Sequence, residues 1–152
     1  MPNVRPVTDF DLDRYAGTWY EIARLDHKFE RGLSRVTARY EARKSGGVTV
    51  VNRGWSEKKR KWSEAVGKAY FRGRADVGDL KVTFFWPFYG SYIVFALDHA
   101  AYQWALVSGD SPKYLWLLAR TPQIPDDLKQ QLLEKAKAAG YDTSKLIFVD
   151  HP

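Results

Sequence analysis

The side chains that most often carry out catalysis are few in this sequence and far apart. Histidine occurs three times, at His27, His99 and His151, and cysteine is absent. We expect these histidines in a loop, in a turn at the opposite end of the fold and in the C-terminal tail, so they cannot share a metal ion or one triad. Neither a glycine-rich phosphate loop nor a Gly-x-Ser-x-Gly elbow occurs. The sequence therefore predicts a protein that is not an enzyme and that uses no cofactor and no metal.

Three aspartates near the N-terminus alternate as they do in part of a calcium-binding loop. Asp9, Asp11 and Asp13 have this spacing, but the glycine and the distal glutamate of such a loop are missing. Aspartate is also a preferred residue at the start of a helix. We therefore predict that these residues cap a short helical turn.

Basic and aromatic side chains are the groups best suited to binding. The chain has a net charge of +6 and contains 6 Trp, 9 Tyr and 8 Phe. Basic residues gather in two predicted loops, 26–32 and 57–61. This charge excess could favour nucleic acid, an anionic membrane surface or an acidic small ligand, and the fold must decide between them.

Length and composition indicate one soluble domain. At 152 residues the chain suits a single domain over residues 1–152 with one core. No apolar run of about 18 residues occurs, and residues 1–5 lack the apolar segment of a signal peptide. Without cysteine there is no disulfide and no thiol for a lipid anchor. We therefore expect the chain as given to be soluble.

Eight short segments are expected to be β-strands. The clearest two-residue period is at 35–41, where Val36, Ala38 and Tyr40 alternate with polar residues. The glycines at 46 and 47 then favour a hairpin turn, because glycine tolerates a positive φ. Short links between the segments indicate antiparallel neighbours. The strands are expected at residues 19–25, 35–41, 48–55, 65–71, 81–86, 92–97, 102–107 and 114–120.

The period changes to that of a helix after the eighth strand. Pro125 and Asp126 are typical of a helix start and Gly140 of its end, and a last strand is expected at 146–149. The apolar stripe between them predicts a helix that packs one face on the sheet. The exposed edges of an open sheet could pair with other chains, so we expect the sheet to close. The predicted fold is all-β, an eight-stranded antiparallel up-and-down β-barrel with the C-terminal α-helix outside and a short final strand.

Three short motifs in this arrangement resemble the signatures of the lipocalin family. They are Gly17-Thr18-Trp19, the turn from Asp98 to Tyr102, and Arg120 at the end of the eighth strand. The resemblance to the bacterial lipocalin subgroup implies a location in the outer membrane or periplasm, although the lipid-modified cysteine usual there is absent from this sequence. The segments that carry this closer resemblance are 19–24, 84–90, 114–122 and 145–149.

Alternate turns of an up-and-down barrel lie at the same end, which separates a floor from a mouth. We interpret Gly17, Trp19, Asp98 and Arg120 as a structural floor. The resemblance implies that Arg120 lies on the indole of Trp19, a contact worth roughly 0.5–2 kcal/mol. The mouth then receives the two basic loops and an aromatic turn at 87–90.

The same alternation predicts which side chains line the lumen. Glu21 and Ala23 should follow Trp19 inward, and a buried Glu21 should find a partner or a raised pKa. The family resemblance alone favours Tyr92 over Ile93 on the sixth strand, and the face of the seventh strand stays open. The candidate ligand-binding residues are Trp116, Tyr114, Leu118, Phe84, Trp86, Phe88, Tyr89, Tyr92, Tyr40, Ala38 and Val36.

A lumen lined by rings and small residues under a cationic rim suits an apolar tail with a polar head. The predicted function is binding and transport or storage of a lipidic amphiphile, a fatty acid or a lysophospholipid. Alternatives are a carrier of haem or another cyclic pigment, and an interaction module whose barrel is filled by its own side chains. Inward rings offer no stacking platform for nucleic acid. We expect a lipidic small molecule as the partner, with a membrane surface as an open second partner, and a monomer or weak homodimer.

Overall fold

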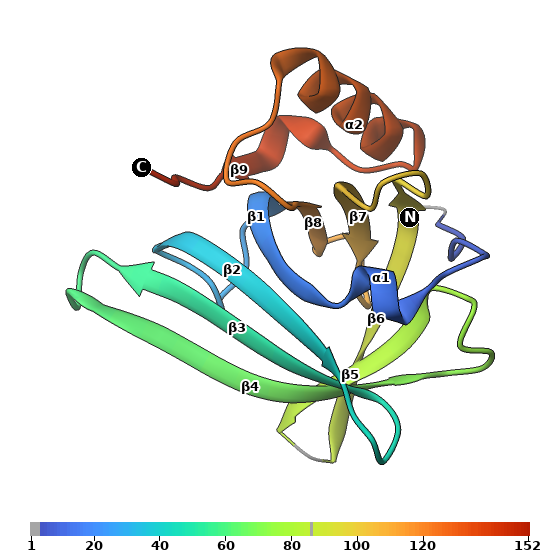
Figure 1. Cartoon of the computed structure of the whole chain (residues 1–152). Coiled ribbons are helices and arrows are strands. Elements are labelled where there is room, and N and C mark those ends of the chain that lie inside the picture. The colour runs from blue at the N-terminus through green and yellow to red at the C-terminus, as the bar shows by residue number, and fades with distance from the viewer. Residues whose placement is uncertain (1–3, 86) are drawn as a thin grey trace.

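Antiparallel strands dominate the computed structural model, which describes residues 4–85 and 87–152 (Figure 1). The strands follow one another along the chain, and the main helix comes after the eighth strand. The elements are α1 Leu12–Tyr15, β1 Gly17–Leu25, β2 Leu33–Ala42, β3 Val48–Ser56, β4 Lys61–Phe71, β5 Asp79–Phe85, β6 Phe88–Leu97, β7 Trp104–Ser108, β8 Leu115–Ala119, α2 Asp126–Ala138, a 3₁₀ turn Thr143–Lys145 and β9 Leu146–Phe148.

The sheet closes on itself. Neighbouring strands pair in the order β2-β3-β4-β5-β6-β7-β8-β1, and β1 also pairs with β2. Every pairing is antiparallel, and β9 adds to β1 on the outside. The predicted eight-stranded up-and-down barrel is thereby confirmed. Its closure leaves no free edge within the ring of strands β1 to β8.

Strand β1 divides its pairing between neighbours and carries a bulge. Its first half pairs with β2, from Gly17 opposite Tyr40 onward, and its second half pairs with β8 and β9. On the β8 side the register shifts between Glu21 and Ala23, so that Ile22 is an extra residue. The prediction that Ala23 faces the lumen is therefore wrong, because the bulge moves it to the outer wall.

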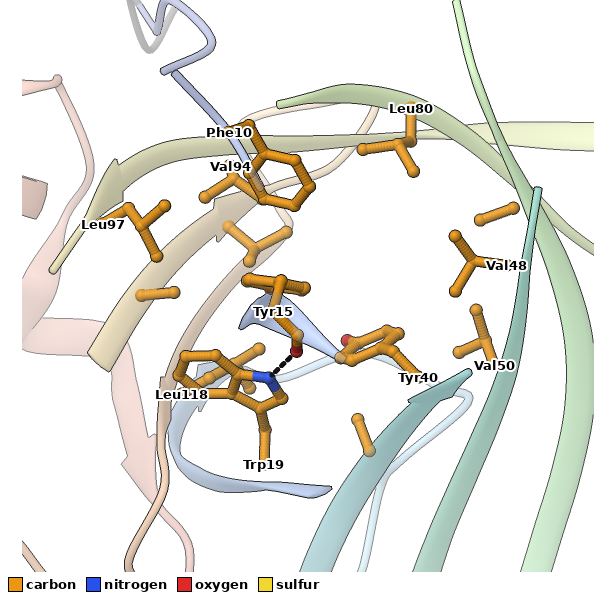
Figure 2. Close-up of a cluster of buried hydrophobic side chains, with 14 of the residues drawn as sticks. Phe10, Tyr15, Trp19, Tyr40, Val48, Val50, Leu80, Val94, Leu97 and Leu118 are labelled. Carbon is orange, nitrogen blue, oxygen red and sulfur yellow. Dashed lines mark hydrogen bonds between the residues drawn. The ribbon is translucent and has the colours of Figure 1, made fainter. Parts of the chain in front are cut away.

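Two apolar cores lie on the two sides of the barrel wall. The inner core contains Trp19, Tyr40, Val94 and Leu118 (Figure 2). The outer core fills the space between α2 and strands β1, β7 and β8 (Figure 1). The helix therefore docks on the wall by one face, as its apolar stripe predicts. The outer core consists of Ile22, Ala23, Leu25, Leu106, Leu115, Leu117, Ala119, Leu132, Ala136 and Tyr141.

Several strand boundaries differ from the prediction, and two of the differences move aromatic residues between strand and turn. Strand β6 begins at Phe88, so Phe88 and Tyr89 belong to a strand and not to a turn. Tyr102 lies in the turn before β7 with φ at +52°, although a strand was expected to begin there. Its backbone nitrogen donates to the carbonyl oxygen of Asp98 at 2.7 Å, which holds it in the turn.

Candidate ligand-binding site

The floor of the barrel is built around Trp19. Its side chain is fully buried, and its Nε1 donates a hydrogen bond to the carbonyl oxygen of Tyr15 at 2.8 Å. The guanidinium carbon of Arg120 lies 3.9 Å from the centre of the indole ring. Arg120 also donates to the carbonyl oxygens of Tyr102 and Thr18, at 3.0 and 3.1 Å. One side chain therefore ties the end of β8 to the start of β1.

The turn between β6 and β7 completes the floor. The carboxylate of Asp98 accepts hydrogen bonds from the backbone nitrogens of Ala101 and Gln103. His99 is bonded through Nε2 to the carbonyl oxygen of Thr8 at 2.9 Å. At the adjoining helix, Asp11 caps α1 by accepting from the backbone nitrogen of Asp13, which matches the predicted role of the acidic turn. These side chains form hydrogen bonds with backbone atoms, and other residues line the lumen.

The lower half of the lumen is filled by aromatic side chains. The hydroxyls of Tyr15 and Tyr92 are 2.6 Å apart, and Tyr92 donates to the hydroxyl of Tyr40 at 2.7 Å. Burial raises the pKa of all three phenols, so they remain neutral. Figure 2 shows Tyr15 and Tyr40 next to Trp19, with Val50 beside Tyr40 on the neighbouring strand and Val48 further along it. The gap left among these side chains measures ≈10 Å³, which is about the limit for one water molecule.

The inner face of β4 becomes exposed toward the mouth. Ala69 is buried, but Ala65, on the same inward face by strand alternation, is exposed. Between them lies Gly67, where an added Cβ would be 2.6 Å from the carbonyl oxygen of Thr83 and 2.7 Å from the ring of Phe84. The phenyl ring therefore lies where a side chain at position 67 would be. Beyond this ring residues 61–66 of β4 are exposed, and β4 pairs with β5 only from Lys68 to Phe71.

A buried polar cluster lies in the upper lumen opposite this open face. Arg24 donates from Nη1 to Glu21 at 3.1 Å, and its Nη2 donates to the carbonyl oxygen of Glu30 at 2.9 Å. The carboxylate of Glu30 also accepts from Nε1 of Trp116 at 2.9 Å and is 3.0 Å from Nε2 of His27. The cluster links β1 and the β1–β2 loop to β8, and so fixes the loop across one side of the mouth.

The pKa values of the two carboxyl groups of this cluster shift in opposite directions. Burial and the neighbouring Glu30 raise the pKa of Glu21 well above its ordinary value. Burial would also raise the pKa of Glu30, but hydrogen bonds from His27 and Glu21 outweigh it and lower the pKa. Glu21 therefore keeps its proton to a higher pH than Glu30, whose carboxylate lies 3.9 Å from the Arg24 guanidinium.

Sequence reasoning missed most of this cluster. It placed Glu21 in the lumen and required a partner for it, and that partner is Arg24. Strand alternation puts residue 24 on the outer face, and only the extra residue Ile22 returns it to the lumen. Neither His27 nor Glu30 was expected inside, because both lie in a loop whose path the sequence does not reveal.

Most of the predicted lining residues come together inside the barrel. Tyr89 instead lies on the outer wall, with its ring 6.5 Å from that of Tyr70 and 4.8 Å from the Lys81 amine. Phe88 is exposed at the mouth, and Trp86 lies outside the described residues. On β7 the inward residues are Ala105 and Val107. The predicted residues placed in the interior are Trp116, Tyr114, Leu118, Phe84, Tyr92, Tyr40, Ala38 and Val36.

Other kinds of site are not formed by the described residues. Within 4–85 and 87–152, no three His, Asp or Glu side chains gather as metal ligands do. In the same ranges, no helix combines the length and apolarity needed to cross a bilayer.

The barrel, the Trp19–Arg120 floor and the trailing helix define a lipocalin, and comparison with known proteins agrees. A family model described as a lipocalin-like domain matches residues 10–151. The chain belongs to the lipocalin family, and within it to the bacterial lipocalins. As a lipocalin it is a binding protein and not an enzyme, and the family supports a small hydrophobic ligand.

Individual relatives are similar over nearly the whole chain. Outer membrane lipoprotein Blc of Vibrio cholerae is 55% identical over 150 residues, which cover 98% of this chain and 88% of that protein. Outer membrane lipoprotein Blc of Escherichia coli K12 is 52% identical, with coverage of 98% and 84%. The solved structure of insecticyanin from the tobacco hornworm Manduca sexta has a TM-score of 0.78 at 23% identity, with coverage of 99% and 86%. This last likeness concerns the fold alone.

Proposed function

We propose that the protein binds a lipidic amphiphile, a fatty acid or a lysophospholipid, with its acyl tail in the upper half of the lumen. The observation that carries this proposal is the contrast along the inner face of β4. Ala69 is buried among the side chains that fill the lower lumen, whereas Ala65, on the same inward face, is exposed near the mouth. A tail entering from the mouth would lie between Phe84 and Trp116 and end above the tyrosines.

The proposal agrees with the energetics of the site. Each methylene group removed from water contributes roughly 0.8 kcal/mol, so a tail of moderate length suffices for micromolar binding. The cationic loops at the mouth suit an anionic head group. Two homologous bacterial proteins carry the name outer membrane lipoprotein, which supports an outer-membrane or periplasmic location for this chain as well.

A substitution that fills the channel tests the proposal. Ala65→Trp places an indole in the open lumen at an exposed position, so we expect the protein to fold and to lose at least tenfold in affinity for a fluorescent fatty acid. Val66→Trp is the matched control, because the neighbouring residue faces the outside of the same strand. The measurement is a fluorescence titration below the critical micelle concentration. Equal affinity of the two variants would place the ligand elsewhere.

A second substitution tests the opposite wall. Trp116 packs against the inner core and anchors Glu30, so Trp116→Phe keeps an aromatic ring and most of the apolar volume but removes the hydrogen bond. Trp116→Ala removes both. We expect affinity to fall modestly for Trp116→Phe and by roughly tenfold for Trp116→Ala. Unchanged affinity in Trp116→Ala, with circular dichroism showing a folded protein, would exclude this wall from the site.

A further inference from the structure

The three most exposed large apolar side chains in the described part of the chain all belong to the mouth. They are Phe88, Phe85 and Phe29, which are 77%, 74% and 65% exposed. Phe85 and Phe88 face each other as the last pair of the β5–β6 hairpin, and Phe29 lies in the β1–β2 loop. In an up-and-down barrel these two connections are at the same end. The apolar exposure is therefore concentrated at one pole of the molecule.

These rings contribute little to the fold. The ring of Phe29 is 6.1 Å from that of His27, and the Lys28 amine lies 5.3 Å from its centre. Neither Phe29 nor Phe85 belongs to the inner or the outer core. Exposed apolar groups gathered in this way usually mark an interaction surface.

Cationic side chains also lie at the mouth. Six Lys and Arg residues belong to the mouth connections, and a seventh, Lys61, is the first residue of β4. Among them Arg31 pairs with Asp26 at 3.1 Å and Arg60 with Glu57 at 3.8 Å. The other five have no carboxylate oxygen within 4.0 Å among the described residues. These unpaired side chains are Lys28, Lys58, Lys59, Lys61 and Lys113.

We propose that the mouth is a docking surface for an anionic lipid bilayer. Phe29, Phe85 and Phe88 enter the boundary between head groups and acyl chains, and the unpaired lysines contact the anionic head groups. Apolar tips on separate loops with lysines spread around them match a plane, whereas an acidic protein partner would need a groove or a charged face. Docked in this way, the open end of the lumen faces the bilayer. The inference goes beyond ligand binding and does not depend on which lipid the lumen takes.

Vesicle sedimentation tests the apolar half of the proposal. The double variant Phe29→Ser/Phe85→Ser should bind vesicles of phosphatidylcholine with phosphatidylglycerol roughly tenfold or more weakly than the unaltered chain. The matched control is Ile147→Ser/Phe148→Ser, which removes two exposed apolar side chains from β9 on the outer wall. This control should bind as the unaltered chain does. Equal binding by both double variants, whether retained or lost, would overturn the proposal.

Charge reversal tests the electrostatic half. Lys58→Glu/Lys59→Glu should weaken vesicle binding, and added salt should weaken it as well. Lys44→Glu/Lys137→Glu makes the same change in net charge away from the mouth, in the turn between β2 and β3 and on α2. It should have a small effect. Equal binding to phosphatidylcholine alone would contradict an anionic surface. Binding to an acidic polypeptide in preference to vesicles would instead identify a protein partner and overturn the proposal.

The docking proposal and the ligand proposal can be tested independently of each other. Ala65→Trp should still sediment with vesicles although its lumen is blocked. Phe29→Ser/Phe85→Ser should still take up a soluble fluorescent fatty acid. Loss of vesicle binding in Ala65→Trp would show that occupancy of the lumen, and not the mouth surface, governs attachment.

Discussion

Glu21 and Glu30 bring two carboxyl groups into the interior of the barrel, next to Arg24 and His27. The pair is tolerated because Arg24 donates to Glu21 and contacts the loop that carries Glu30. A buried ion that loses its partner is costly, often by several kcal/mol. The cluster is therefore best regarded as a device that fixes the β1–β2 loop and not as a source of net stability.

The opposite pKa shifts of Glu21 and Glu30 predict how stability depends on pH. The raised pKa of Glu21 contributes stability below its ordinary value of 4.5, and this contribution is lost as pH rises through the folded-state pKa. The lowered pKa of Glu30 contributes stability above 4.5 and is lost as pH falls through its folded-state value. We expect the free energy of unfolding to decline on both sides of a mildly acidic range.

Glu21→Gln separates the two contributions. The amide cannot ionise but can still donate to Glu30, so the decline at higher pH should disappear while the decline in acid remains. As pH rises from 4.5, the slope of the unaltered chain should approach that of one proton. Denaturant titrations at a series of pH values measure this slope. The interpretation fails if the variant and the unaltered chain have parallel curves throughout the range above pH 4.5.

Trp19 has a structural role that its conspicuous motif does not reveal. Its indole is buried between Tyr15 and Arg120 at the floor, far from the open part of the lumen. Trp19→Ala should lower the free energy of unfolding by roughly 3–5 kcal/mol. Trp62→Ala, which removes an exposed indole, should change it by less than about 1 kcal/mol. Chemical denaturation of both variants provides the measurement.

At the scale of single elements, the sequence predicts regular strands well and irregular ones poorly. The alternation in β2 correctly places Ala38 and Tyr40 inside, because the irregularity of this strand lies before them, between Ser34 and Thr37. In β1 the bulge at Ile22 reverses the faces of Ala23 and Arg24, and no residue type in the segment announces it. The polar cluster was therefore unpredictable, since it depends on Arg24 pointing inward.

The start of β6 shows a second reason for failure. Pro87 and Gly90 favour a turn when only neighbouring residues are considered. In the structure Ser91 donates its backbone N–H to the Asp110 carboxylate at 2.7 Å, and the strand extends back to Phe88. Asp110 comes from the loop between β7 and β8, so the residues at the start of β6 do not by themselves predict this contact.

Helix α2 is predictable because its apolar residues recur at helical spacing and the same residues pack on the barrel wall. Leu132 is fully buried against the outer wall of the barrel. Leu132→Ala should therefore lower the free energy of unfolding by roughly 2–5 kcal/mol, whereas Gln131→Ala on the exposed face should have almost no effect. Thermal unfolding followed by circular dichroism compares the two. Similar melting temperatures would mean that the helix does not stabilise the barrel.

The whole molecule combines a filled floor with an open mouth, and this polarity should appear in its response to ligand. A ligand that binds only the folded chain stabilises it by mass action, by about 2.7 kcal/mol at a hundredfold excess over Kd. A soluble fatty acid should therefore raise the melting temperature of the unaltered chain and of Val66→Trp. It should leave the melting temperature of Ala65→Trp unchanged. A rise in all three would indicate binding outside the lumen.

The seam that closes the barrel also constrains how the chain reaches its native state. The hydrogen bond from Arg120 to Thr18 joins residues 102 positions apart, and β1 pairs with β8 along the same seam. Such closure has a high loop-entropy cost, which makes folding slow relative to helical proteins of this size. During synthesis the second half of β1 has no partner until β8 has left the ribosome. For most of that time its unpaired edge, with the apolar residues Ile22, Ala23 and Leu25, is available to other chains, so the nascent protein is more prone to aggregation than the finished barrel.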